Sequence, residues 1–347
     1  MEILVPGPEA DARVTELRAA GFDLVDGWSA GGPELTALAA LPQPPAGCPE
    51  AWDPGDEERV EELSRYVVCK WRRTIARLPR SDVYHLLRTA RNRHLISDAD
   101  QASWSASLVG VVGLSVGSSA ATACQLTGVR RFRIGDGDEL GITNLNRIVD
   151  SAFNVGTAKT ESLRRRLLEC DPYASVDTFP QGISESDIDS FLCGDSGDEQ
   201  LSVLIEEIDG IHMKVALRRR ARELRIPVVM ATDLGDDVVL DVERFDIDEH
   251  TPILGDRLAS FSDDQLRDRE PSTAVALAGA LLADVVTPRM LEVAGEVGRS
   301  LSSWPQLGST AMHSGAVAAH AARLICTGHE LATGRYLLRS EFTTTHN

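Results

Sequence analysis

The sequence predicts an α/β protein whose Rossmann-like, mostly parallel sheet is flanked by helices, with antiparallel late strands and a small N-terminal α/β addition. Three observations predict its central unit. An apolar run over residues 108–114 is long enough for a buried strand, and an Ala-rich segment that ends near Gly128 has the composition of a helix. Residues 132–134 form a second short strand, which leads into Asp136. Strand, tight turn, helix, strand and terminal acid is the order of a mononucleotide-binding βαβ unit.

The turn after the first strand is built of small residues, among them Gly113 and Gly117. Small residues let backbone N–H groups approach a phosphate at the positive end of the following helix, so these two glycines are candidate nucleotide-binding residues. Asp136 stands where a ribose hydroxyl would bind, and its carboxylate can accept a hydrogen bond from that hydroxyl. Ser115 and Ser118 replace the second and third glycines of the dinucleotide fingerprint, so a crossover that binds no nucleotide remains an alternative.

Three motifs follow one another after the first strand and helix. They are Asp136-Gly-Asp138, Thr143-Asn-Leu-Asn-Arg-Ile148 and Gly156-Thr-Ala-Lys159. The ordered set resembles the ThiF/MoeB/ubiquitin-activating-enzyme-like adenylyltransferase superfamily, in which D-x-D is followed by S-N-L-x-R-Q and then by G-x-x-K. The resemblance extends from about Arg91 to Leu338.

This resemblance implies ATP-dependent adenylation of a carboxylate, with ATP and Mg²⁺ bound and with an acyl-adenylate and pyrophosphate as products. The carboxylate would be the C-terminus of a ubiquitin-like or sulfur-carrier protein, or of a peptide. Joining two anions requires cations around the triphosphate, which agrees with the residues present. Arg147 and Lys159 can supply fixed positive charge, and Asn144 and Asp138 complete the predicted nucleotide site. Taken singly, the two basic residues could equally be solvated side chains at helix ends.

An acidic strand end is the candidate metal site. In the superfamily a strand ends in D-x-x-D-N, and its last Asp holds Mg²⁺ on the ATP phosphates. Glu206 and Asp209 occupy the corresponding positions in this sequence, with Gly210 in place of the commoner Asn. A carboxylate at the carboxyl end of a parallel strand is well placed to bind a hard cation, so Asp209 is the predicted metal ligand. The alternative is that Asp209 caps the helix expected over residues 211–224.

One arginine is expected to act from a second subunit. The superfamily has an R-Y-N-R-Q-like segment before the first strand, whose second Arg reaches across a dimer interface to the nucleotide phosphates. Arg93 matches that Arg best, and Arg91 is its competitor. The resemblance therefore implies a homodimer in which Arg93 joins Arg147, Lys159 and Asp209 as a catalytic residue. Solvated arginines on an exposed helix are the structural alternative.

Composition excludes several classes of protein. The formal net charge of −18 argues against a nucleic-acid-binding surface, which needs clustered Lys and Arg. No apolar run is long enough to cross a membrane, and the first residues do not have the pattern of a signal peptide, so a cytoplasmic protein is expected. Six cysteines occur without a C-x-x-C pair, which predicts reduced thiols and no zinc site. Cys193 is the most plausible exposed thiol, but a buried or inert Cys193 is expected, so no catalytic cysteine is predicted.

The chain is expected to contain two domains. Residues 1–80 would be an accessory domain of unknown role, and residues 81–347 the ThiF-like adenylation domain, with a nucleotide-binding core over 107–245 and a C-terminal helical and dimer region over 246–347. Helical spacing predicts a helix over 57–78. The apolar segment 274–286 is expected to be buried, the basic helix 211–224 is typical of a solvated face, and the tail from residue 340 is expected to be disordered.

Three other functions remain open. An NAD(P)-dependent oxidoreductase would keep Asp136 on the ribose, but it would not need Arg147, Lys159 and Asp209 at their positions in the motifs. A non-catalytic ThiF-like subunit would tolerate the departures at Ser115, Ser118 and Gly210. A scaffold that binds a partner protein through the N-terminal domain alone is a further alternative, which no sequence feature tests.

Overall fold

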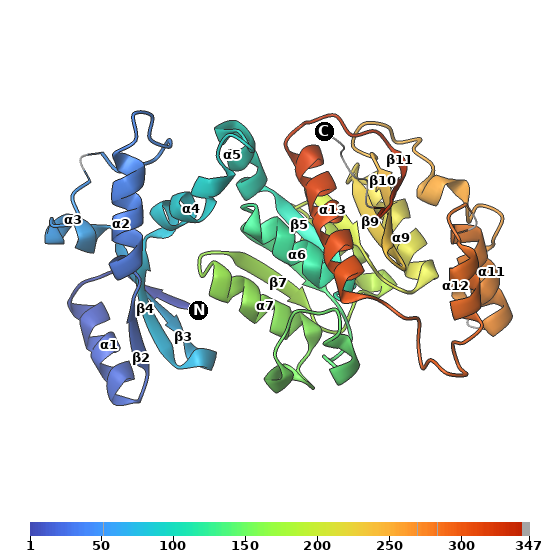
Figure 1. The fold of residues 1–347 in the computed structure, drawn as a ribbon, viewed down its shortest axis with the longest axis horizontal. Helices are drawn as coiled ribbons and strands as arrows, with labels where there is room; N and C mark the ends of the chain where they lie inside the picture. The colour runs from blue at the N-terminus through green and yellow to red at the C-terminus, as the bar shows by residue number, and fades with distance from the viewer. Residues whose placement is uncertain (51, 269, 283, 342–347) are drawn as a thin grey trace. The chain divides into compact units, whose positions relative to one another are not determined.

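The chain forms two compact units (Figure 1). The computed structural model describes residues 1–50, 52–268, 270–282 and 284–341, so most of the predicted disordered tail lies outside the described residues. Unit 1 consists of residues 1–102 and 167–174, and unit 2 of residues 103–166 and 175–347. The predicted accessory domain ends at residue 80, earlier than unit 1, and its boundary stays a prediction.

Unit 1 contains a four-stranded sheet with helices beside it. Its strands are β1 (Glu2–Leu4), β2 (Asp23–Asp26), β3 (Ser64–Cys69) and β4 (Thr74–Pro79). Its helices are α1 (Pro8–Ala19), α2 (Trp28–Ala39), α3 (Glu57–Glu62) and α4 (Ser81–Thr89), and α5 (Asp98–Ala106) continues from unit 1 into unit 2. The strand order is β1-β3-β4-β2, with β2 parallel to β4 and antiparallel pairing between β1 and β3 and between β3 and β4.

The predicted helix over residues 57–78 is wrong. Only α3 is helical there, and β3 and β4 then form an antiparallel hairpin in which Val68 pairs with Ile75. Both side chains are buried and pack against Val14 and Leu17 of α1. The apolar spacing fits a helical period over its first part, but short apolar runs do not distinguish a strand from a helix.

Unit 2 has the predicted α/β architecture. Its seven strands are β5 (Leu108–Val112), β6 (Arg131–Gly135), β7 (Ser175–Phe179), β8 (Val203–Glu206), β9 (Val228–Leu234), β10 (Asp237–Glu243) and β11 (Gly334–Leu338). They lie in the order β11-β10-β9-β8-β5-β6-β7. Neighbouring strands pair in parallel along the series β9, β8, β5, β6 and β7. β10 pairs antiparallel with both β9 and β11, which confirms the predicted late antiparallel strands.

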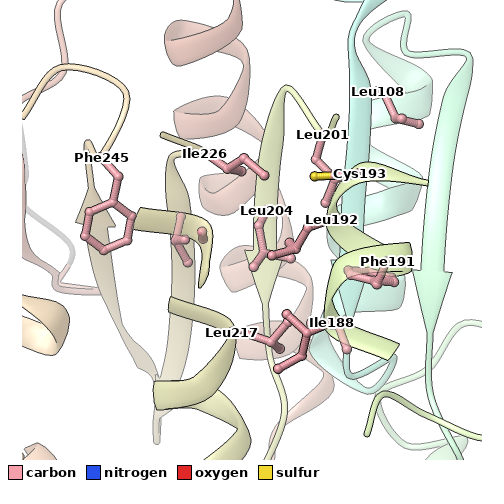
Figure 2. Packing of buried hydrophobic residues seen from close by; sticks show 13 residues of the cluster. Leu108, Ile188, Phe191, Leu192, Cys193, Leu201, Leu204, Leu217, Ile226 and Phe245 are labelled. Atoms are coloured by element: carbon pink, nitrogen blue, oxygen red, sulfur yellow. The ribbon is translucent and has the colours of Figure 1, made fainter. Parts of the chain in front are cut away.

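Helices cover both faces of this sheet (Figure 1). The helices of unit 2 are α6 (Val116–Leu126), α7 (Lys159–Cys170, of which the part from residue 167 belongs to unit 1), α8 (Ile188–Cys193), α9 (Ile211–Glu223), α10 (Asp263–Arg267), α11 (Pro271–Leu282), α12 (Pro288–Ala294) and α13 (Gly308–Cys326). α8 and α9 pack on the face that carries Leu108 and Leu204, where Phe191 and Leu217 are fully buried (Figure 2). α6 and α13 pack against each other and against the sheet.

Two expectations about buried and solvated helices are wrong. The segment 274–286 is not buried as a whole: only Leu277 and Leu281 are buried among its described residues, and Val275 is 73% exposed. The basic helix α9 is not a fully solvated face, because Lys214 and Arg218 are buried. They pair with Glu206, and Arg218 also binds Glu243. Within the part of the chain that the structure describes, no helix is long and apolar enough to cross a membrane.

The contact between α13 and α6 gives a test of the fold. A Cβ atom at Gly315 would lie 2.5 Å from Ser119 Cβ and 2.6 Å from the backbone nitrogen of Ala120. We expect Gly315→Ala to lower the free energy of unfolding by about 1–3 kcal/mol, because the two helices must separate. Gly279→Ala on α11 is the matched control, since a Cβ there meets no atom within 4 Å. Urea denaturation measures both, and an equal effect of the two substitutions would contradict the packing described.

Candidate functional site

The candidate site lies at the carboxyl ends of three neighbouring parallel strands. Val112 at the end of β5 is paired with Gly135 of β6 and with Glu206 of β8. The residues that follow these strand ends therefore meet at one edge of the sheet, where ligands bind in open α/β folds. They include Gly113 and Asp136 from the predicted site.

Asp136 organises the turn between β5 and α6. Its Oδ2 accepts a hydrogen bond from the backbone nitrogen of Leu114 at 2.7 Å, and its Oδ1 accepts one from the backbone nitrogen of Asp138 at 2.8 Å. Gly113 has φ +82°, and a Cβ there would lie 2.7 Å from the backbone nitrogen of Ile208. A side chain at residue 113 is thus excluded by both backbone conformation and space. Binding of a ribose by Asp136 stays a prediction, for which the carboxylate retains unused lone pairs.

Gly117 brings α6 close to β5. A Cβ at this position would lie 2.9 Å from Val111 Cγ1. This is the role of a glycine in close helix–strand packing, and any contact of Gly117 with a phosphate stays a prediction.

Lys159 joins the D-x-D and G-x-x-K motifs. Its Nζ lies 2.7 Å from Asp138 Oδ2 and 3.6 Å from Asp136 Oδ2. Its backbone nitrogen donates to the carbonyl of Asp138 at 3.0 Å, which fixes the start of α7 beside the end of β6. Asp138 is largely exposed, so a phosphate could replace it as the partner of this ammonium group.

Arg147 lies beside the N-terminus of α6. Its Nε donates to Ser115 Oγ at 2.8 Å, and Ser115 is the residue that precedes the first turn of that helix. Burial lowers the pKa of Arg147 from its ordinary value, while the charges of Asp209 and Asp233 oppose that shift. Arginine nevertheless stays protonated in proteins, so a fixed cation lies at the positive end of the helix.

Asn144 caps the loop that carries Arg147. Its Oδ1 accepts a hydrogen bond from the backbone nitrogen of Gly141 at 2.8 Å, at the start of the short 3₁₀ turn Ile142–Asn144. Its carbonyl accepts from the backbone nitrogens of Arg147 and Ile148. The contact of Asn144 with a nucleotide stays a prediction.

Asp209 is exposed and close enough to Arg147 for their charges to interact. Within the described residues it makes no hydrogen bond or ion pair, and no group of three or more His, Cys, Asp or Glu side chains could hold a metal ion. Mg²⁺ commonly takes one or two carboxylates together with substrate phosphates, so a single available carboxylate fits that ion. Glu206 does not offer a second ligand, because Lys214 and Arg218 occupy its oxygens.

Two further residues singled out in the sequence, Arg93 and Cys193, belong to other parts of the structure. Arg93 belongs to unit 1, where its Nη1 donates to the carbonyl of Gln43 at 2.8 Å and its Nε lies 3.5 Å from Asp98. Its action on the nucleotide of a second subunit stays a prediction. Cys193, the most plausible exposed thiol in the sequence but one expected to be buried or inert, is buried at the end of α8 among apolar side chains (Figure 2), and burial raises the pKa of its thiol.

Sequence reasoning missed Asp233, near the end of β9. This carboxylate is buried and accepts hydrogen bonds from Ser314 of α13 and, at 3.5 Å, from Gln306. The rule that selects Asp209, an acid at the carboxyl end of a parallel strand, applies equally to Asp233. The apolar run of this strand ends at Ala231, two residues before the acid, whereas β9 continues to Leu234.

The chain belongs to the ThiF family, whose sequence profile matches residues 89–345. An uncharacterised protein of Mycobacterium tuberculosis is 34% identical over 286 residues, which is 81% of this chain and 38% of that protein. The tRNA threonylcarbamoyladenosine dehydratase of Escherichia coli is 30% identical over 165 residues, or 46% of this chain and 56% of the enzyme. The chain thus spans well under two thirds of the length of these relatives.

Solved structures share the fold. TcdA (CsdL) superimposes with a TM-score of 0.51 at 21% identity over 72% of this chain and 98% of that one. PaaA superimposes with a TM-score of 0.50 at 18% identity, over 75% of this chain and 68% of its own. Both likenesses agree with the predicted ThiF-like α/β architecture.

Because the carboxyl group of Asp233 is buried, we expect the free energy of unfolding to depend on pH. Burial raises its pKa above the ordinary value of 3.8, against the opposing hydrogen bonds and the charge of Arg147. The unfolded chain therefore releases this proton at lower pH than the folded protein, and stability falls as pH rises until the folded group ionises. We expect Asp233→Asn to become progressively more stable relative to the parent protein from about pH 4 upward.

Urea denaturation at several pH values measures this difference. Asp195→Asn, in the exposed loop before β8, is the matched control. A pH-independent difference for Asp233→Asn would show that the pKa of Asp233 is not raised by burial.

Proposed function

We propose that this chain activates a carboxylate by ATP-dependent adenylation. The observation that supports it most is the hydrogen bond of 2.8 Å between Arg147 and Ser115, which holds a cation at the N-terminus of α6. Helix N-termini and fixed cations both favour a polyphosphate. Lys159 adds a second cation at the neighbouring strand end, and Asp209 adds a carboxylate suited to Mg²⁺.

In this mechanism the substrate carboxylate attacks the α-phosphorus in line and pyrophosphate leaves. Asp136 and the backbone beside Gly113 would hold the ribose and the phosphates. Arg147 and Lys159 would offset the negative charge that accumulates between the two anions, which requires no covalent nucleophile from the protein. Mg²⁺, when bound, would neutralise charge on the phosphate oxygens beside Asp209.

Relatives support the kind of ligand and substrate. The E. coli dehydratase that matches this chain in sequence has been crystallised in complex with ATP and with AMP. Another relative, 24% identical over 198 residues, is the ubiquitin-like modifier-activating enzyme 5 of Arabidopsis thaliana. We propose that the substrate carboxylate belongs to a small carrier protein or a peptide, that the protein acts in the cytoplasm as a homodimer, and that Arg93 of the second subunit approaches the nucleotide.

Ligand-dependent thermal unfolding tests the proposal without knowledge of the carboxylate. A ligand at about 100 times its Kd adds about 2.7 kcal/mol of stability, which raises Tm by a few degrees. We expect ATP with Mg²⁺ to raise the Tm of the parent protein, ATP with EDTA to raise it less, and Asp136→Ala to abolish the rise. Asp136 also holds the turn after β5, so the ligand-induced shift is compared rather than Tm itself.

Arg299→Ala is the matched control, because this arginine is exposed and lies in the C-terminal segment after α12. It should keep the full ATP response. Stabilisation by NAD(P)H alone would replace the proposal with the oxidoreductase alternative. Stabilisation by no nucleotide would favour the non-catalytic subunit, and the search would turn to a partner protein.

A further inference from the structure

The Arg147 guanidinium is held by neutral groups. Arginine has five N–H donors, and its contacts in this loop involve only two of its three nitrogens. Nε donates to Ser115 Oγ at 2.8 Å, while Nη1 donates to Asn146 Oδ1 at 3.0 Å and to the carbonyl of Thr143 at 3.2 Å. Within the described residues, the second terminal nitrogen, Nη2, makes no hydrogen bond and Arg147 forms no ion pair.

Hydrogen bonds to neutral groups leave an arginine more able to bind an anion than ion pairs with carboxylates do. They fix the direction of the guanidinium without an ion pair among the described residues. Asp209 and Asp233 act on its charge only from beyond ion-pair distance, so a phosphate can still bind to it. Lys159 is the contrasting case, because two carboxylates lie within 3.6 Å of its Nζ and a phosphate must compete with them. Arg147 therefore needs no exchange of partners before it binds a phosphate.

Asn146 is itself held from the far end of the sequence. Its Nδ2 donates to the backbone carbonyl of Gln306 at 2.8 Å, immediately before α13. The backbone of Gly308 lies against Asn146, since a Cβ at Gly308 would overlap the Asn146 carbonyl oxygen. The segment Trp304-Pro-Gln-Leu307 thus has a place in the site, because the carbonyl of Gln306 fixes the amide that holds Arg147.

We propose that Ser115 and Asn146 are positioning residues, which direct the Arg147 guanidinium so that Nη2 is left for the phosphates of ATP. The inference rests on the proposed function. It also gives a role to Ser115, where a glycine would offer no hydroxyl acceptor. Ser115 holds Nε from the position that precedes α6, and Asn146 holds Nη1 from the loop.

Equilibrium binding to the full chain, measured by calorimetry, tests this inference. We expect Ser115→Ala and Asn146→Ala each to weaken ATP–Mg²⁺ binding about tenfold, the loss typical of one hydrogen bond to a charged group. Adenosine lacks phosphates, so its affinity should change by less than about twofold. Ser115→Thr keeps a hydroxyl and should restore ATP binding. Ser103→Ala, an exposed serine of α5, is the matched control and should leave both affinities unchanged.

The outcomes separate this inference from the proposed function. An equal loss of ATP and adenosine binding, or no loss of either, overturns the positioning role while ATP binding by the parent protein still supports adenylation. If Ser115→Ala does not fold, the ATP–Mg²⁺ and adenosine affinities of Asn146→Ala are compared in the same way. Ser115→Thr should then bind ATP–Mg²⁺ as the parent protein does. A parent protein that binds adenosine and ATP–Mg²⁺ equally well, or neither, overturns both proposals, because Arg147 then contributes nothing to triphosphate binding.

Discussion

The Asp136 carboxylate is the contact on which the geometry of the candidate site depends. It stands after β6 and accepts backbone hydrogen bonds from Leu114 after β5 and from Asp138 in its own turn. One side chain thus fixes where α6 begins relative to the neighbouring strand. The same carboxylate lies 3.6 Å from Lys159, so the start of α7 is tied to this point as well. Two helix N-termini and two strand ends are aligned before any ligand arrives.

Much of this arrangement is predictable from the sequence because it depends on local order. An apolar strand followed by small residues, a helix and an acid specifies a βαβ unit, and the motifs around Arg147 and Lys159 follow in the same stretch of chain. The hairpin of β3 and β4 is not predictable in this way, because its apolar spacing also fits a helix and long-range pairing decides between them. Ser115 is visible in the sequence as a departure from glycine, but its contact with Arg147 spans 32 positions and requires the fold.

The burial of charged side chains on α9 is also not predictable from the sequence pattern. The basic residues of α9 suggest a solvated face, yet Lys214 and Arg218 are buried against the sheet with Glu206 and Glu243. Two cations and two carboxylates balance there, which is the condition under which buried charges are tolerated. Sequence spacing reveals which residues share a helix face, but not that strands β8 and β10 bring acids to that face.

Arg147 differs from these buried cations in the kind of groups that hold it. A chain with a formal net charge of −18 repels a polyphosphate at long range, so any attraction must be local. The buried cations Lys159 and Arg218 are both paired with carboxylates. Arg147 is instead held by a hydroxyl, an amide and a carbonyl at the positive end of α6. Its charge and the helix dipole add in the same place, so the site can attract an anion without first breaking an ion pair.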